Sequence, residues 1–268
     1  YGNAISGVFD MKMRNGNNRN NENTFQFGLL GIDVASEGPF SKNGSPSYIF
    51  NYRYSTLGLL SKLDKSSDID GVMDYQDINF KVNMPTKKAG TFTVWGTGLI
   101  DKFSDIRDDN PNEWENTQDN FTYKGKQYVA AGGLTHKYFF GTRSYLKTTL
   151  ATTFSEHKAF QDAYNVNLNS SPYMDLYRRN TNLVLTSAYN HKFGAKHTNK
   201  TGFTYTRMIY DMNMDMAPYE AEPLENISHG KGQTDLLNIY TSSDISLSDR
   251  FKMNIGVNSQ FLSLNSCP

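Results

Sequence analysis

The chain has 268 residues, and its 27 basic and 27 acidic side chains give a formal net charge of +0 and a pI near 7.1. This balance excludes the basic excess with which proteins neutralise nucleic-acid phosphates. A single cysteine, Cys267, excludes an internal disulfide, and the abundance of Tyr and Phe, 17 of each, favours β structure.

The first predicted element is a strand-like run at residues 5–14, which leads into NGNNRNN at residues 15–21. This polar connector has no means of packing a core. The chain starts at Tyr1 with neither an initiator Met nor a signal peptide, and it stops at Pro268 directly after another strand-like run. We therefore expect the sequence to be an internal piece of a longer protein.

Ten further strands are predicted from runs in which apolar and polar residues alternate. Ile78, Phe80 and Val82, for example, are separated by Asn79 and Lys81. Side chains alternate across a strand, so such runs have one apolar and one polar face. The ten strands are expected at about residues 24–36, 47–54, 78–85, 91–100, 126–138, 144–155, 181–193, 201–213, 234–246 and 251–264.

The connections between these strands are predicted to alternate between short and long. Four long ones, at residues 55–77, 101–125, 156–180 and 214–233, have 20 or more residues each. Outer-membrane barrels combine tight turns at one end with long loops at the other. No stretch reaches the roughly 18 apolar residues of a membrane helix, but the mean hydropathy of -0.61 is compatible with strands that line a wet lumen.

Aromatic residues recur beside the short turns, where an interfacial belt of a membrane barrel is expected. The alternative is that aromatic residues simply favour strands and pack together near turns. The residues concerned are Phe40, Tyr48, Phe92, Phe139, Tyr145, Phe193, Phe203 and Phe251.

Signatures of enzymes and metal sites are absent from the sequence. There is no G-x-S-x-G, P-loop, H-E-x-x-H or C-x-x-C motif. The acidic residues between positions 101 and 119 do not have EF-hand spacing, so a solvated loop is favoured over a Ca²⁺ site. We predict no catalytic residue, no metal and no cofactor. The five histidines are scattered and are expected on the surface or the lumen wall: His136, His157, His191, His197 and His229.

Two groups of residues are candidates for binding. Trp114, Tyr123, Tyr173 and Tyr177 are predicted to lie in the long loops, where rings beside polar groups can stack on sugars or enclose an apolar ligand. Internal packing of the loops is the alternative role for them.

The strand at residues 47–54 supplies the second group. If Tyr48, Tyr52 and their alternating neighbours face lipid, Asn51 and Arg53 face the interior, where a guanidinium needs a partner. A plug domain is the candidate partner, and a water-exposed arginine is the alternative.

Several segments resemble TonB-dependent receptors of the Bacteroidota type. YGNAISGVFDMKMRNG at residues 1–16 is similar to the last strand of their plug domain and the linker after it. GIDVASEGPF at 31–40 resembles the first barrel strand and its turn, and NYRYSTLGLL at 51–60 and DYQDINF at 74–80 resemble the next two. The resemblance covers about the first 85 residues; beyond them only the rhythm of strands and loops matches.

The resemblance implies an all-β fold, an antiparallel up-and-down transmembrane β-barrel, of which about ten strands of an expected 22 are present. Residues 1–14 would be the last plug strand, 15–23 a polar linker and 24–268 the first part of the barrel. It also implies a receptor in the Gram-negative outer membrane that imports a scarce glycan, peptide, metal chelate or vitamin. Its partners would be membrane lipid, the TonB complex, the nutrient and, in some receptors, a surface lipoprotein.

Two other classes of protein remain open. A ten-stranded outer-membrane protease of the omptin type matches the strand count, but it needs paired carboxylates with a histidine. Asp211 and Asp215 have no evident histidine partner in the sequence. A passive structural barrel is the second alternative. Pairing between strand 24–36 and strand 251–264 would indicate a complete ten-stranded barrel and favour either of these alternatives.

Overall fold

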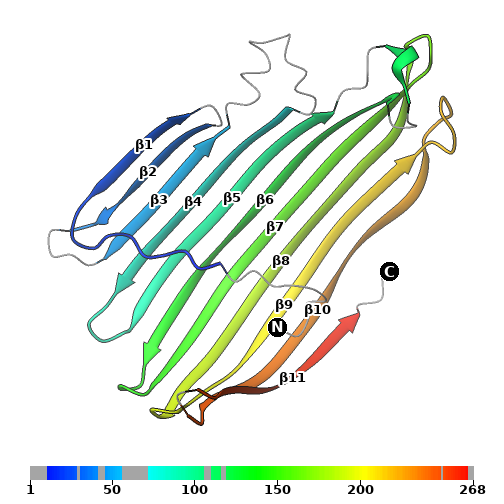
Figure 1. Cartoon of the computed structure of the whole chain (residues 1–268). Coiled ribbons are helices and arrows are strands. Elements are labelled where there is room, and N and C mark those ends of the chain that lie inside the picture. The colour runs from blue at the N-terminus through cyan, green and yellow to red at the C-terminus, as the bar shows by residue number, and fades with distance from the viewer. Residues whose placement is uncertain are drawn as a thin grey trace.

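The computed structural model describes residues 11–28, 31–41, 46–55, 72–105, 110–115, 119–248 and 250–264. Within these ranges the chain forms one 11-stranded sheet, in which each strand lies beside its neighbours in sequence order (Figure 1). Every pairing is antiparallel, so the predicted all-β, up-and-down architecture is confirmed. The strands are β1 (Glu22–Gly28), β2 (Gly31–Pro39), β3 (Ser47–Tyr54), β4 (Val72–Pro85), β5 (Thr91–Asp105), β6 (Phe121–Phe139), β7 (Ser144–Tyr164), β8 (Ser170–Gly194), β9 (His197–Met216), β10 (Glu225–Ser246) and β11 (Lys252–Leu264).

The prediction of a single strand at residues 24–36 is wrong, because this stretch contains two strands. β1 and β2 form a hairpin in which Gly28 is the register partner of Gly31. Leu29 and Leu30 between these glycines continue the apolar pattern of the sequence, which hid the break. The two glycines were the available signal for the reversal, and Gly31 also permits a close approach, since a Cβ there would lie 2.8 Å from the Tyr54 carbonyl oxygen.

All four connections predicted to have 20 or more residues are shorter than predicted, because β4, β5 and β6 also run past their expected ends, and two of the four are short. β7 continues to Tyr164 and β8 begins at Ser170, so the connection is residues 165–169; the one between β9 and β10 is residues 217–224. In the first connection, Leu168 has φ 59 and the Asn165 side chain accepts a hydrogen bond from the Asn169 backbone N–H at 3.1 Å. The extra strand length was missed because polar and apolar residues are mixed on both of its faces. Antiparallel order still places all of these connections at one end of the sheet, here called the loop end, opposite the turn end.

The sheet has two chemically different faces, which the strand register defines. The apolar face carries Phe80, Leu134, Leu150, Leu183 and Ile239, all of them large side chains that are more than a third exposed. The polar face carries the alternate residues, mostly Thr, Asn and Lys. Only four small apolar residues are buried within the described ranges, all of them alanines. The sheet therefore has no conventional core, and its apolar side chains point away from the protein.

No helix in the described part of the chain is long and apolar enough to cross a membrane.

Candidate functional site: the polar face and the segment that crosses it

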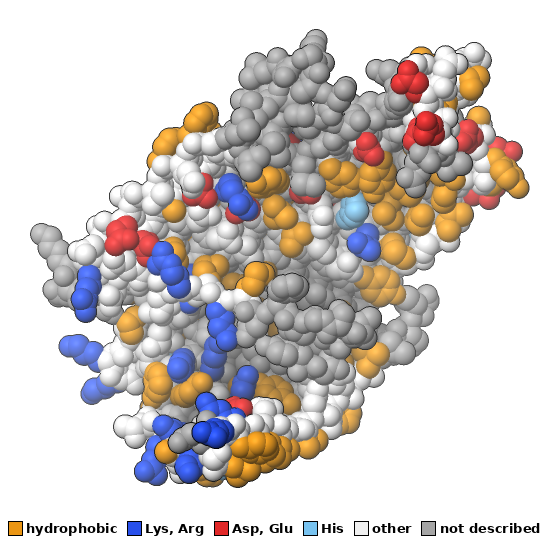
Figure 2. Space-filling model, in the orientation of Figure 1, with side chains coloured by type: hydrophobic (Ala, Val, Ile, Leu, Met, Phe, Trp, Pro, Cys, Tyr) orange, Lys and Arg blue, Asp and Glu red, His pale blue; other side chains and the backbone are white. Residues whose placement is uncertain are grey.

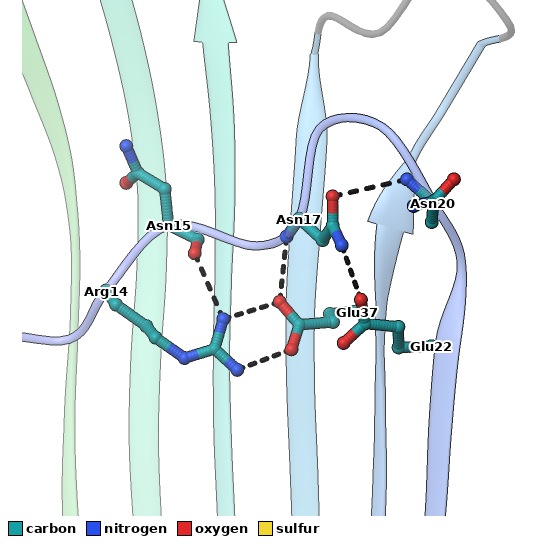
Figure 3. A network of polar contacts seen from close by, with 6 residues as sticks. All are labelled: Arg14, Asn15, Asn17, Asn20, Glu22 and Glu37. Carbon is teal, nitrogen blue, oxygen red and sulfur yellow. Dashed lines mark hydrogen bonds and ion pairs between the residues drawn. The ribbon is translucent and has the colours of Figure 1, made fainter.

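The described part of the N-terminal segment, residues 11–21, crosses the polar face in front of the first strands of the sheet (Figure 1). It is held there by charged side chains. The Arg14 guanidinium donates to both carboxylate oxygens of Glu37 on β2, and the Lys81 ammonium on β4 donates to the Met13 carbonyl oxygen at 2.7 Å. Glu37 also accepts from the Asn17 backbone N–H at 2.7 Å (Figure 3). Its side chain is only 12% exposed, so Glu37 is the anchor of the segment.

The hydrogen bond to Glu37 raises the pKa of the Arg14 guanidinium above its already high ordinary value.

The polar connector is also better organised than its composition suggested. The Asn17 side-chain oxygen accepts from the backbone N–H group of Asn20, and its amide group donates to Glu22 at the start of β1 (Figure 3). The same oxygen also accepts from the backbone N–H group of Arg19. Such an Asx turn reverses the chain without any apolar contact. Asn17 thereby links the anchored segment to the first strand.

Replacing Glu37 with glutamine is expected to release this segment. The substitution removes the charge that pairs with Arg14 and weakens the bond from the Asn17 backbone N–H. Charge-assisted hydrogen bonds contribute about 1.5–3 kcal/mol to stability. Because Arg14 is exposed to water, we expect the lost stabilisation of the segment to be at the low end of this range. Hydrogen exchange of residues 13–17 should accelerate about 10-fold. Glu22→Gln removes the same charge but keeps an oxygen that can accept from the Asn17 amide, so it is the control. Equal exchange in both variants would contradict the role of Glu37.

Residues 5–14, predicted as a plug strand, lie mostly outside the described residues. The described positions 11–14 are not part of any strand, although they do lie over the polar face. The domain assignment of residues 1–14, 15–23 and 24–268 stays a prediction.

Asn51 and Arg53, predicted to face the interior, both lie on the polar face. Their partners, however, come from the neighbouring strands. Arg53 Nε donates to Asp77 Oδ2 at 2.7 Å, and Asn51 Nδ2 donates to Asp33 Oδ1 at 2.9 Å. The Arg53 guanidinium also lies over the Tyr75 ring, 5.3 Å from its centroid. A contact with a plug domain stays a prediction for both residues; carboxylates of β2 and β4 already satisfy much of their hydrogen-bonding capacity.

The four aromatic residues predicted to bind ligand from loops are not brought together. Trp114 follows the short 3-10 turn η1 (Pro111–Glu113) and lies in a connection, whereas Tyr123 is in β6 and the other two are in β8. Tyr123 is on the polar face, 5.3 Å from the Phe103 ring. Tyr173 packs against Phe121 at 4.9 Å, and Tyr177 lies on the apolar face beneath Lys158. The loop placement of the three tyrosines is therefore wrong, because the strands run past their predicted ends. A ligand-binding role stays a prediction for all four.

A groove of about 760 Å³ lies across the polar face of β8 to β11. Hydroxyl, amide and ammonium groups from four strands converge in it, and Lys200 Nζ lies 5.4 Å from the Tyr240 ring centroid. This feature was not predicted, because its residues come from strands far apart in the sequence. Alternate Thr and Asn positions on β9 and β10 were the available signal. Side chains that line it include Thr186, Lys200, Thr204, Asn238, Tyr240 and Gln260.

Charge is distributed unevenly over the polar face. Figure 2 shows Lys and Arg side chains gathered toward the turn end and Asp and Glu side chains toward the loop end. Lys81 and Lys147 contribute to the basic side, and Asp101 and Asp105 to the acidic side. A charged solute near this face would therefore meet a potential that changes sign along the strands.

Aromatic rings form a continuous chain at the turn end of the apolar face. Phe140 contacts Tyr138 and Tyr189 at centroid distances of 5.0 and 6.2 Å. His191 continues the chain to Phe193 at 4.4 Å. Of the residues predicted for an interfacial belt, Phe92 and Phe193 belong to this chain, whereas Phe139 and Tyr145 lie on the polar face, so the belt prediction is wrong for these two. The histidines of this aromatic chain, which also include His136 and His197, were not expected to take part.

The carboxylates considered for an enzyme have no histidine partner among the hydrogen bonds of the described residues. Asp215 accepts from Asn213 and Asn226, each at 2.7 Å, and the side-chain partner of His229 is Asn213. Asp211 faces the Lys231 ammonium at 3.7 Å. Across the described ranges, no group of three His, Cys, Asp or Glu side chains has a geometry suited to a metal ion.

Comparison with known proteins gives a match in fold. No family model matches the chain, and neither does any curated protein. A crystal structure of BauA, the ferric preacinetobactin receptor from Acinetobacter baumannii, matches over 92% of this chain with a TM-score of 0.58 and 13% sequence identity. The chain spans 42% of the length of that receptor. The similarity extends over nearly the whole chain and is one of architecture.

Proposed function

We propose that the chain is part of a TonB-dependent receptor of the Gram-negative outer membrane, which imports a scarce nutrient through a plugged barrel. The observation that carries this proposal is the exposed apolar face. The apolar outward runs include residues 92–100 of β5, 128–138 of β6 and 146–154 of β7, which are nine, eleven and nine residues long. A tilted strand needs about 9–11 residues to cross the hydrocarbon of a bilayer.

The ends of these runs support the same placement. On each strand from β5 to β10, the outward run gives way at the loop end to a charged residue. A charge is costly in hydrocarbon and acceptable at its edge. The aromatic chain at the turn end suits the opposite interface. The six charged residues are Lys102, Lys126, Glu156, Arg179, Arg207 and Asp235.

The edges of the sheet favour a receptor over the ten-stranded alternatives. β1 and β11 lie at opposite ends of the strand order, and no pairing joins them within the described residues. Unpaired backbone groups cannot face lipid, so further strands must close the barrel. The segment anchored by Glu37 lies on the face that becomes the barrel interior, as expected for a chain arriving from a plug. The fold match to a receptor agrees with this assignment.

The nutrient is a glycan, peptide, metal chelate or vitamin, and the chain acts by binding and transport rather than by catalysis. The groove on β8 to β11 is the part of the interior best supplied with hydrogen-bonding groups. Energy would come from the TonB complex through a more N-terminal part of the protein. A surface lipoprotein is a further candidate partner, and the protein would be of the Bacteroidota type.

Epitope tags inserted in two connections test this proposal. A tag in residues 217–224 should be reached by antibody on intact cells, whereas one in residues 86–90 should not, because these connections lie at opposite ends of the sheet. The protein should fractionate with the outer membrane. Under nutrient limitation, cells whose growth requires this protein should stop growing when TonB is deleted. Recovery in a soluble fraction, or growth independent of TonB, would overturn the proposal.

A further inference from the structure

Three lysines stand side by side on the apolar face at its loop-end edge. Lys102 on β5 is the register partner of Lys126 on β6, and Lys126 is the register partner of Lys158 on β7. Like charges directly opposite one another destabilise a sheet. Lys124, two residues further along β6, lies on the same face and adds a fourth positive charge. A bound anion next to these lysines would offset their mutual repulsion.

The acidic residues nearby leave this row incompletely neutralised. Asp175 on β8 shares the apolar face and is the register partner of Phe160, but among the described residues it forms no ion pair with a lysine of the row. Glu156 on β7 is already held by Arg179, whose Nη2 lies 2.9 Å from Glu156 Oε2, and by the Lys158 ammonium at 3.3 Å. Asp74 on β4 is the register partner of Lys102 at one end of the row. Glu156 is therefore shared between two cations, and the centre of the row around Lys126 keeps an excess of positive charge.

An apolar depression of about 350 Å³ lies next to the row, on the membrane side. It exists because Gly98 and Ala130 are small, while larger side chains such as Ile78, Ile100 and Phe154 surround them. A Cβ at Gly98 would meet Ile78 Cγ2 at 3.3 Å, so the glycine sets the depth here. The depression is open to the side on which the proposed function places lipid.

Lys126 connects the two features. Its ammonium lies 4.7 Å from the centroid of the Tyr128 ring, and Tyr128 lines the depression. A molecule with its apolar part in the depression would therefore have its polar end directly beside the lysines. We propose that this surface binds a membrane lipid with a phosphate headgroup, with the phosphate at Lys102, Lys126 and Lys158 and an acyl chain in the depression. The inference rests on the proposed membrane location.

The test uses the full-length protein extracted from the membrane into a neutral detergent, with phosphatidylglycerol as the probe and phosphatidylcholine as its uncharged counterpart. Binding is measured by native mass spectrometry across a lipid titration. We expect one retained phosphatidylglycerol and no comparable retention of phosphatidylcholine. In Lys102→Gln/Lys126→Gln the affinity should fall about 30-fold, which corresponds to about 2 kcal/mol for two surface charges. Lys87→Gln/Lys88→Gln, in the turn between β4 and β5, removes the same charge elsewhere and should bind like the unaltered protein.

A second variant tests the acyl-chain part separately. Ala130→Phe fills the depression with an exposed side chain and should lower phosphatidylglycerol retention while leaving the lysines in place. Glycerol phosphate, which has the headgroup chemistry without acyl chains, should bind far more weakly than the lipid. If glycerol phosphate bound as tightly as the lipid, the surface would be a simple anion site and the lipid site would be overturned. If both lysine double variants lost phosphatidylglycerol affinity equally, binding would depend on overall charge and not on this surface. If the protein stayed soluble without detergent, the proposed function would be refuted. This outcome is distinct from a failure of the lipid site alone.

Discussion

Replacing Leu185 with arginine is expected to destabilise the membrane-inserted, folded protein strongly. Leu185 lies on the apolar face of β8, between Tyr189 at the turn end and Arg179 at the loop end. An arginine near the midplane of a bilayer costs about 2–4 kcal/mol on the lipid face of a barrel. That energy corresponds to a loss of about 30- to 1,000-fold in the equilibrium between folded and unfolded protein. The folded fraction in lipid vesicles, measured by urea titration, reports the change.

Val184→Arg is the matched control for this prediction. Val184 is the next residue on the same strand, it is also apolar, and it lies on the polar face. An arginine there would enter the proposed wet interior and should leave the urea midpoint close to that of the unaltered protein. Equal destabilisation by both substitutions would mean that the two faces meet similar surroundings, and the membrane placement would fail.

The strands were predictable where one face is apolar and the other polar. β4 shows this best, since Ile78, Phe80 and Val82 mark one face without ambiguity. The alternation disappears where β7 and β8 continue toward the loop end, because each face there mixes polar residues with apolar ones such as Ala159, Phe160 and Leu176. Glu156 and Arg179 were consequently assigned to a loop, although they form an ion pair across two strands. Alternation reports a difference in composition between the faces, and a strand whose two faces are both mixed carries no such signal.

The candidate site was much less predictable than the fold. That Asn51 and Arg53 share a face follows from strand periodicity alone, but their partners Asp33 and Asp77 require the register between strands. The anchor at Glu37 joins residues about twenty positions apart, and the groove on β8 to β11 joins four strands. Register depends on turn lengths and bulges, and alternation alone does not locate the register shift between Lys192 and Gly194, although a glycine is compatible with a bulge. Local patterns thus define faces, whereas sites that cross strands need the whole sheet.

The two adjacent glycines in β6, Gly132 and Gly133, differ in the space available for a side chain. A Cβ on Gly133 would lie 2.7 Å from the Leu150 carbonyl oxygen and 2.9 Å from the Ala151 Cβ, both of them fixed parts of β7. A Cβ on Gly132 would come no closer than 3.4 Å to any atom outside its own neighbours. Gly133→Ala must therefore push β6 and β7 apart, and overpacking of this kind costs about 1–3 kcal/mol. Gly132→Ala should be neutral or stabilise the protein by up to about 1 kcal/mol, since alanine loses less chain entropy on folding. Urea midpoints at constant m value distinguish the two variants. Identical midpoints would show that the close approach of β6 and β7 at Gly133 is not a feature of the folded protein.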